Sequence, residues 1–149
     1  MSIVCRRVAG LDIHRDTVVA CLRLRVAEGK YEEKTATFGT FTAQLKDLAQ
    51  WLREHRVKKV AMESTGVYWI PVWNALERFP YRFELTLVNP AQVKALIGHK
   101  TDQIDSARLA DFHAHGRLAG SFIPAPAVRE ARALERQRVT IQQDRNRDR

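Results

Sequence analysis

The sequence predicts an α/β fold: a mixed five-stranded sheet with flanking helices, followed by a basic helix at the C-terminus. Two observations support this prediction. The first 40 residues contain three stretches with strand-like patterns separated by short turns, and from residue 42 onward helical and strand-like periods alternate. Three antiparallel strands followed by alternating helices and strands are typical of a mixed sheet with helices packed on its faces.

The three opening strands are predicted at residues 3–13, 16–26 and 31–38. The first is β-branched and apolar, and the second places Val18, Ala20 and Leu22 on one face. Residues 14–16 leave room only for a tight turn, so the first two strands form a hairpin. The third strand alternates with polar residues, as expected near the edge of a sheet.

Helices and strands alternate in the rest of the chain. Apolar residues at helical spacing predict helices at residues 42–55, 67–79, 89–97, 102–115 and 128–149. Short apolar runs predict strands at residues 57–62 and 84–88. We expect Thr40 or Thr42 to cap the first helix. Pro71 would lie in the first turn of the second helix, where proline is tolerated.

The composition excludes several classes of protein. Lysine and arginine number 25 and aspartate and glutamate 17, which gives a net charge of +8 and favours polyanionic partners, chiefly nucleic acid. Every apolar run is too short to span a membrane, and no secretory signal follows Arg6 and Arg7. Cys5 and Cys21 lie outside any zinc-binding spacing. We therefore expect free thiols and a cytoplasmic, nucleoid-associated protein.

Four carboxylates occur where predicted strands end or a predicted helix begins. Asp12 and Glu63 end two strands that are often neighbours in a mixed sheet, and Asp102 and Asp105 share one helix face. Two carboxylates 4 Å apart repel by about 4 kcal/mol at an effective dielectric constant of 20. Two Mg²⁺ or Mn²⁺ ions would cancel this repulsion, because oxygen-only ligands suit these cations. Such an ion pair serves phosphodiester chemistry.

Each acid also has an ordinary interpretation. Asp12 would be a hairpin residue, and Glu63 would be a solvated acid in a loop. Asp102 would be a helix N-cap, and Asp105 a first-turn acid favoured by the helix dipole. Taken singly, these interpretations stay open, and it is the joint arrangement of the four acids that favours a metal site.

Four motifs, in this order, make the chain resemble a known family. They are Gly10-Leu11-Asp12-Ile13-His14, Met62-Glu63-Ser64-Thr65-Gly66-Val67-Tyr68-Trp69, Val88-Asn89-Pro90-Ala91-Gln92-Val93-Lys94 and Lys100-Thr101-Asp102-Gln103-Ile104-Asp105-Ser106-Ala107-Arg108. Over residues 8–145 the chain resembles the N-terminal domain of the DEDD transposases. These are insertion-sequence recombinases related to the Piv and MooV invertases, and some are guided by a bridge RNA. Their catalytic domain is similar to the Holliday-junction resolvase RuvC, an RNase H-like fold.

The resemblance implies a role for the four acids. It identifies Asp12, Glu63, Asp102 and Asp105 as catalytic residues that hold divalent metal, two Mg²⁺ or Mn²⁺ ions, and act on DNA phosphodiesters. It also implies a RuvC-like domain at residues 1–122. Residues 123–149 would begin a basic linker or coiled-coil helix, truncated before a second domain with a serine thought to attack DNA.

Two functions follow from this comparison. The first is the catalytic domain of an insertion-sequence transposase, which cleaves DNA and transfers strands but is incomplete without the serine domain. The alternative is a truncated, non-catalytic fragment that binds nucleic acid or dimerises. An actin-like kinase would need a glycine-rich phosphate loop after Asp12, and residues 14–16 do not supply one. The terminal helix needs a packing partner, so we expect a homodimer or a higher homo-oligomer that binds DNA and, in the guided case, a bridge RNA.

Further residues are candidates for contact with nucleic acid. Thr65 and Tyr68 would meet a phosphate at a helix start, or form a tight turn with Tyr68 packed. Lys100 would contact a phosphate or be solvated. Four arginines at helical spacing would bind nucleic acid or form a solvated or dimer-forming face: Arg129, Arg132, Arg136 and Arg138.

Aromatic and histidine side chains leave similar alternatives. Trp69 and Trp73 would stack on bases if exposed, or pack in the core. His14 adjoins Asp12 in the sequence and would touch metal or substrate. His113 and His115 fit the end of a helix, where cationic side chains are favoured.

Overall fold

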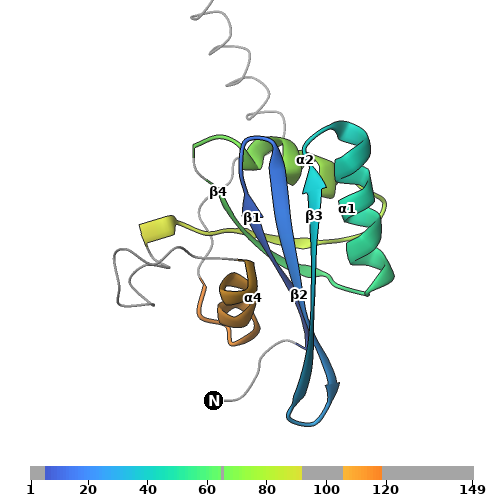
Figure 1. The fold of residues 1–149 in the computed structure, drawn as a ribbon, viewed down its shortest axis with the longest axis vertical. Coiled ribbons are helices and arrows are strands. Elements are labelled where there is room, and N and C mark those ends of the chain that lie inside the picture. The colour runs from blue at the N-terminus through green and yellow to red at the C-terminus, as the bar shows by residue number, and fades with distance from the viewer. Residues whose placement is uncertain (1–5, 65, 92–105, 119–149) are drawn as a thin grey trace, which may run out of the picture.

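The computed structural model describes residues 6–64, 66–91 and 106–118 (Figure 1). The elements are β1 (Arg7–Ile13), β2 (Thr17–Ala27), β3 (Lys30–Gly39), α1 (Thr42–Glu54), β4 (Lys59–Ser64), α2 (Trp69–Arg78), β5 (Glu84–Leu87) and α4 (Ser106–Ala114). Their order confirms the predicted α/β architecture. The start of the first predicted strand, most of the helix predicted from residue 89 and the C-terminal helix lie outside the described residues.

The five strands form one mixed sheet in the order β3-β2-β1-β4-β5. β1, β2 and β3 pair antiparallel as a meander, whereas β4 pairs parallel to both β1 and β5. Parallel neighbours need a crossover connection, and α2 supplies it between β4 and β5. The predicted hairpin is confirmed, and β3 lies at the edge of the sheet as expected.

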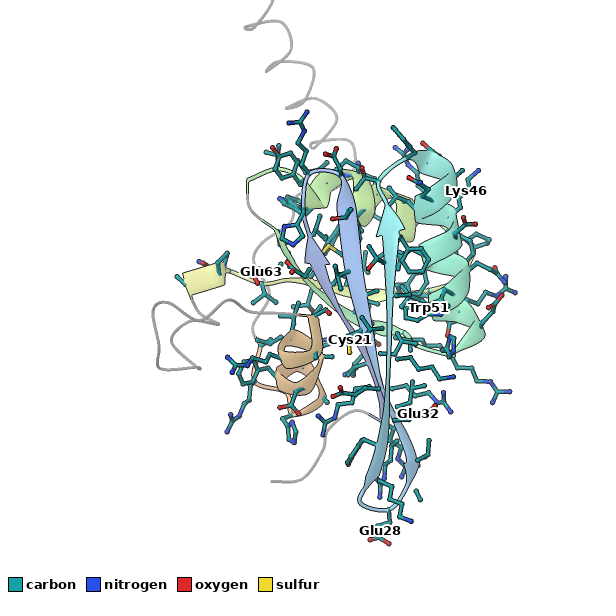
Figure 2. The ribbon with its side chains drawn as sticks, viewed as in Figure 1. Cys21, Glu28, Glu32, Lys46, Trp51 and Glu63 are labelled. Carbon is teal, nitrogen blue, oxygen red and sulfur yellow. The ribbon has the colours of Figure 1, made fainter. Side chains whose placement is uncertain are left out.

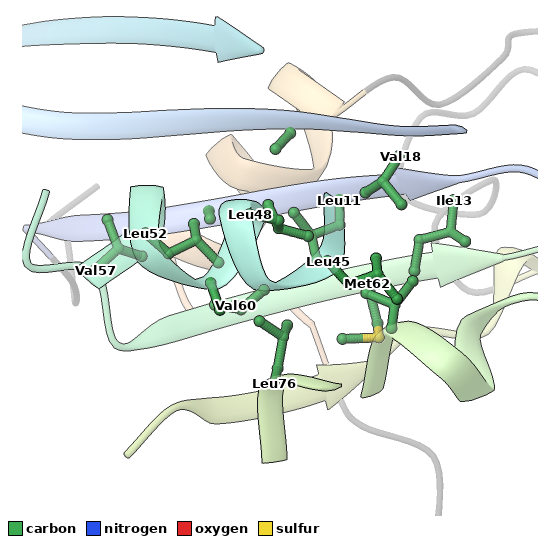
Figure 3. Packing of buried hydrophobic residues seen from close by; sticks show 14 of the residues in the cluster. Leu11, Ile13, Val18, Leu45, Leu48, Leu52, Val57, Val60, Met62 and Leu76 are labelled. Atoms are coloured by element: carbon green, nitrogen blue, oxygen red, sulfur yellow. The ribbon is translucent and has the colours of Figure 1, made fainter. Parts of the chain in front are cut away.

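Helices α1 and α2 cover one face of the sheet. Leu48 and Leu52 of α1 pack with Leu11 of β1, Met62 of β4 and Leu76 of α2 in the larger core (Figure 3). Each fully buried side chain of this kind stabilises the fold by about 1.5–3 kcal/mol relative to an exposed one. The core therefore fixes β1 and β4 rigidly beside each other, which matters for the residues at their ends.

Helix α4 packs on the opposite face (Figure 1), against β1, β2 and β4. Because side chains alternate along a strand, Val8, Gly10 and Asp12 share this face. Val8 packs against Ala110 and Ala114 of α4. The second half of α4 therefore packs on β1 near the start of that strand.

Two expectations about helix starts are wrong. The N-cap of α1 is Phe41, without a side-chain cap, and Thr42 is the first helical residue. The Thr40 hydroxyl donates instead to the carbonyl oxygen of Arg15, at 3.4 Å. Helix α2 begins at Trp69 rather than Val67, because residues 66–68 form a turn in which Gly66 has a φ of +62°. Pro71 lies in the first turn of α2, as predicted.

The described residues also bear on the membrane question. None of the helices in residues 6–64, 66–91 and 106–118 combines the length and the apolar character that crossing a bilayer requires.

Candidate active site

Asp12 and Glu63 lie next to each other near the carboxyl ends of two parallel strands. β1 and β4 pair with Asp12 directly opposite Glu63, one residue before each strand ends. Residues that oppose each other across a ladder point to the same face of the sheet. Both acids therefore belong to the face that α4 covers, and Figure 2 labels Glu63 on β4. This pairing confirms the expectation that the two strands are neighbours.

The hairpin between β1 and β2 helps to orient Asp12. The backbone N–H of His14 donates to the carbonyl oxygen of Thr17 at 2.8 Å, which closes the turn. The His14 imidazole then lies with Nε2 3.0 Å from Oδ2 of Asp12. The Asp12 side chain is 25% exposed, so solvent reaches a carboxylate that the fold already holds in one place. His14 thus contacts the acid directly.

Gly10 determines how closely α4 approaches this pair of acids. A Cβ atom built on Gly10 would lie 2.3 Å from the carbonyl oxygen of Ser106 and 2.6 Å from the backbone nitrogen of Ala110. Only glycine permits such an approach, since both neighbours are backbone atoms. Ser106 is the first described residue of α4 and is joined by one peptide bond to Asp105. Ser106, at the start of α4, therefore lies beside β1 at Gly10, which precedes Asp12 by two residues.

The remaining predicted site residues lie outside the described residues. These are Thr65, Lys100, Asp102, Asp105, Arg129, Arg132, Arg136 and Arg138. Within residues 6–64, 66–91 and 106–118, no three His, Cys, Asp or Glu side chains are grouped closely enough to hold a metal ion. The described part of the site therefore consists of Asp12 and Glu63. Two carboxylates of this kind suit a hard, oxygen-seeking cation such as Mg²⁺ or Mn²⁺.

Tyr68 lies at the surface of the molecule, between β4 and α2 in the sequence. It follows Glu63 by five residues, at the turn before α2, and is 40% exposed. Residues 66–68 do form a tight turn, as one interpretation expected, but Tyr68 is exposed rather than packed there. The Tyr68 side chain is accessible to a ligand.

The two tryptophans of α2 belong to the core. Trp73 is buried and Trp69 packs against the same cluster. Their rings meet edge to face with centroids 5.9 Å apart, and the Trp73 indole N–H donates to Oε2 of Glu77 at 2.8 Å. The core interpretation of this pair is confirmed, and base stacking on Trp73 is excluded.

The two histidines at the C-terminal end of α4, His113 within the helix and His115 just after it, differ from each other. Burial, and to a lesser extent the charge of Lys59, lowers the pKa of His113 to about 4. His113 is therefore neutral at neutral pH, and the expectation that it favours the helix end as a cation is wrong. His115 does interact with the end of α4, because its Nδ1 lies 2.8 Å from the carbonyl oxygen of Asp111.

Sequence reasoning missed two features of the site. The first is the close approach of α4 at Gly10, for which the signal is a glycine inside a strand, because such a glycine often marks a close backbone approach. The ion pair between Arg23 of β2 and Asp111 of α4 was also missed. Its partners are 88 residues apart, so no local pattern indicates that they meet.

Comparison with known proteins identifies the family and the fold type of this chain. The IS110-type DEDD transposase family, whose description is "Transposase", matches residues 9–149. No curated protein sequence matches the chain.

Among solved structures, the chain is similar to Thermus thermophilus RuvC. The identity is 18% with a TM-score of 0.51, covering 80% of this chain and 83% of that one. RuvC from the same organism in complex with a Holliday junction substrate gives 15% identity and a TM-score of 0.50, with coverage of 78% and 100%. These similarities show that the mixed sheet is a RuvC-like, RNase H-like fold. Together with the family match over nearly the whole chain, they establish that this protein belongs to the IS110 family of DEDD transposases, which is related to Piv and MooV and is of the bridge-RNA type.

Proposed function

We propose that this domain catalyses divalent-metal-dependent cleavage of DNA phosphodiesters and, together with the serine domain that the family resemblance implies, strand transfer during transposition of an insertion sequence. The observation that best supports this proposal is the register of β1 and β4, which sets Asp12 opposite Glu63. Two neighbouring carboxylates repel each other. A fold that nevertheless holds two of them side by side suits a site that binds cations.

The other half of the proposed site comes from the segment that leads into α4. Asp105 immediately precedes Ser106, and Asp102 lies three residues earlier in the sequence. Consecutive Cα atoms are only about 3.8 Å apart. The Ser106 carbonyl oxygen lies against Gly10, two residues before Asp12, and this contact supports including Asp105, the residue before Ser106 in the sequence. We therefore assign all four acids to one metal centre.

The chemistry of the donor set fits Mg²⁺ or Mn²⁺. Two such ions, when bound, supply the positive charge that stabilises the attacking and leaving oxygens of a phosphodiester. The residues of the chain would hold and orient these ions. Asp12 is already oriented by its contact with the His14 imidazole, and the buried core beneath β1 and β4 fixes the spacing of the two strands.

DNA is the substrate that a transposase domain binds, and the net charge of +8 favours it. Exposed Tyr68 would contact DNA near the acids, together with Thr65 and Lys100. Four arginines would extend this contact along the proposed linker at residues 123–149: Arg129, Arg132, Arg136 and Arg138. A bridge RNA and a second copy of the chain are the further partners that this proposal includes.

Cleavage of a branched DNA tests the proposal, because the similar RuvC structure is a complex with a Holliday junction substrate. The 149-residue chain is incubated with Mn²⁺ and an end-labelled four-way DNA junction, and products are resolved on a denaturing gel. We expect metal-dependent cleavage that Asp12→Asn and Glu63→Gln each abolish.

Asp16→Asn is the matched control, because Asp16 lies in the same hairpin, is exposed, and pairs only weakly with Arg15 at 3.9 Å. It should cleave like the wild-type chain. If the wild-type chain binds the junction without metal-dependent cleavage, or if Asp12→Asn cleaves normally, the catalytic proposal is wrong. The first of these results would favour the non-catalytic nucleic-acid-binding function.

A further inference from the structure

Six exposed cationic side chains gather where β1, β4 and β5 begin, at the end of the sheet opposite to the acids. The parallel register sets the starts of these strands side by side, and the Glu84 backbone N–H donates to the carbonyl oxygen of Lys58 at 2.7 Å. Helix α1 ends beside them, because the Arg7 guanidinium donates to the carbonyl oxygen of His55 at 2.8 Å. We call this surface the amino-end patch, and its members are Arg6, Arg7, Arg53, Arg56, Lys58 and Arg82.

Nearby acids compensate little of this positive charge. Glu84 pairs with Lys59, and Glu32 with Lys34, each at 3.8 Å. Glu54, the last residue of α1, offsets one charge. Within residues 6–64, 66–91 and 106–118, no ion pair joins an acid to any of the six cations. The end of α1 carries only about half a negative charge, so stabilisation of the helix end does not account for six cations.

Arg56 occupies a position where the backbone favours glycine. Its φ is +57°, and among the described residues other than glycine it alone has a positive φ. Its N–H donates to the carbonyl oxygen of Arg53 at 2.9 Å, and the Val57 N–H donates to that of Leu52 at 3.0 Å. These two bonds form a Schellman motif, whose left-handed residue is usually glycine, because other side chains disfavour that conformation. The exposed arginine therefore lowers stability and adds charge to the patch.

The chemistry of the amino-end patch suits the phosphate backbone of duplex DNA. Arginine and lysine neutralise DNA phosphates, and a duplex carries one negative charge per about 1.7 Å of its axis. A single strand is bound through stacking on aromatic rings as well. The rings that flank Arg82, Tyr81 and Phe83, are partly buried and pack against each other with centroids 4.9 Å apart. The patch offers charge without a stacking surface, which favours a duplex.

The amino-end patch is separate from the candidate active site. Arg7 precedes Asp12 by five residues within β1, and five residues of strand span about 17 Å. A phosphate bound at the patch is therefore a different one from the phosphate proposed to meet the acids.

We infer that the amino-end patch is a second DNA-binding surface, which holds the backbone of a duplex segment away from the bond that is cleaved. Contacts to phosphates add affinity and orientation without reading the sequence. The inference rests on the proposed function in one respect, the choice of DNA as the partner, and it needs neither metal nor cleavage.

The salt dependence of DNA binding tests this inference. Fluorescence anisotropy measures the affinity of the 149-residue chain for a labelled linear DNA duplex in EDTA, over a series of salt concentrations. Each lost phosphate contact lowers the slope of log affinity against log salt by about 1. We expect Arg53→Gln/Lys58→Gln/Arg82→Gln to lower it by about 3, equally for duplexes of different sequence, with an unchanged melting temperature.

The matched control removes the same charge elsewhere. Lys30 and Lys34 are exposed on β3, and Lys46 is exposed in the first half of α1 (Figure 2). Lys30→Gln/Lys34→Gln/Lys46→Gln changes the net charge of the chain as much as the patch variant does. It should keep the wild-type slope.

Arg56→Gly tests the patch independently. We expect the melting temperature to rise, because glycine suits the left-handed conformation, while the slope falls by about 1. A residue with only a structural role would leave the slope unchanged, and that result would overturn the DNA contact of Arg56.

The outcomes separate this inference from the proposed catalysis. Equal slopes for the patch variant and its lysine control overturn the inference. Affinity lost for a single-stranded RNA but kept for the duplex overturns DNA as the occupant. If the wild-type chain binds no duplex at low salt, the inference and the DNA partner of the proposed function are both overturned. A chain that shows the expected slopes but never cleaves the four-way junction retains the patch and loses only the catalytic proposal.

Discussion

Gly10 shows how a single residue sets the geometry of the candidate site. Elsewhere in a strand a glycine weakens the sheet, because it adds entropy to the unfolded chain and buries no side chain. Here the missing Cβ lets the backbone of α4 reach the backbone of β1. The same contact places Ser106, at the start of α4, against Gly10, and Gly10 precedes Asp12 by two residues. The packing role and the proposed site role of Gly10 thus have one physical cause.

Gly10→Ala is therefore expected to harm the fold. The new methyl group would overlap the Ser106 carbonyl and the Ala110 nitrogen, so α4 must shift. Overpacking of this kind costs about 1–3 kcal/mol, which urea unfolding followed by circular dichroism would measure. Gly29→Asn is the control, since Gly29 has a φ of +71° in open space and asparagine tolerates that conformation. A Gly10→Ala chain as stable as the wild type would contradict the close packing.

Among the helices, α1 has the least expected start. Its N-cap position holds Phe41, which is 79% exposed and makes no capping hydrogen bond with its side chain. Partial compensation comes from Gln44, whose Oε1 accepts from the Phe41 backbone N–H at 3.2 Å. Sequence patterns favoured the nearby threonines for this role. They failed because Thr40 bonds to the first hairpin and Thr42 already lies within the helix.

Phe41→Asp should stabilise the chain. The N-cap backbone is extended, with φ −70° and ψ 155°. A carboxylate there can accept hydrogen bonds from the backbone N–H groups of the first turn. It also interacts favourably with the positive end of the helix dipole. The expected gain is about 1 kcal/mol, seen as a higher melting temperature. Phe41→Ala removes the exposed ring without supplying a cap, and it should show no such gain. Equal melting temperatures for the Asp and Ala variants would refute the capping argument.

Helix α4 differs from α1 because its placement depends on contacts between distant parts of the sequence. Its existence was predicted from apolar spacing, and its end near residue 115 agrees with the structure. Its position was not predictable, because Arg23 and Asp111 are separated by 88 residues. The start of α2 was misjudged for a local reason. The pattern around Val67 looks helical, but Gly66 in a left-handed conformation keeps the chain in a turn until Trp69.

At the scale of the whole molecule, the sheet was the most predictable feature. Alternating side chains identified the β1–β2 hairpin and the edge strand β3, and the switch to helical spacing after residue 40 indicated the crossovers. The juxtaposition of Asp12 and Glu63 followed from the expected strand order, which the parallel pairing confirms. What the sequence did not reveal was the face that α4 covers, since that depends on side chains meeting across the sheet.

The central claim is that acids from two distant segments form one metal centre. Calorimetric titration of Mn²⁺ into the 149-residue chain tests it most directly, beside Asp12→Asn from β1 and Asp105→Asn from the segment before α4. We predict saturable binding to the wild-type chain, loss of that binding in both variants, and unchanged binding in Asp16→Asn. Binding that survives Asp105→Asn undiminished, or that never occurs in the wild-type chain, would contradict the account.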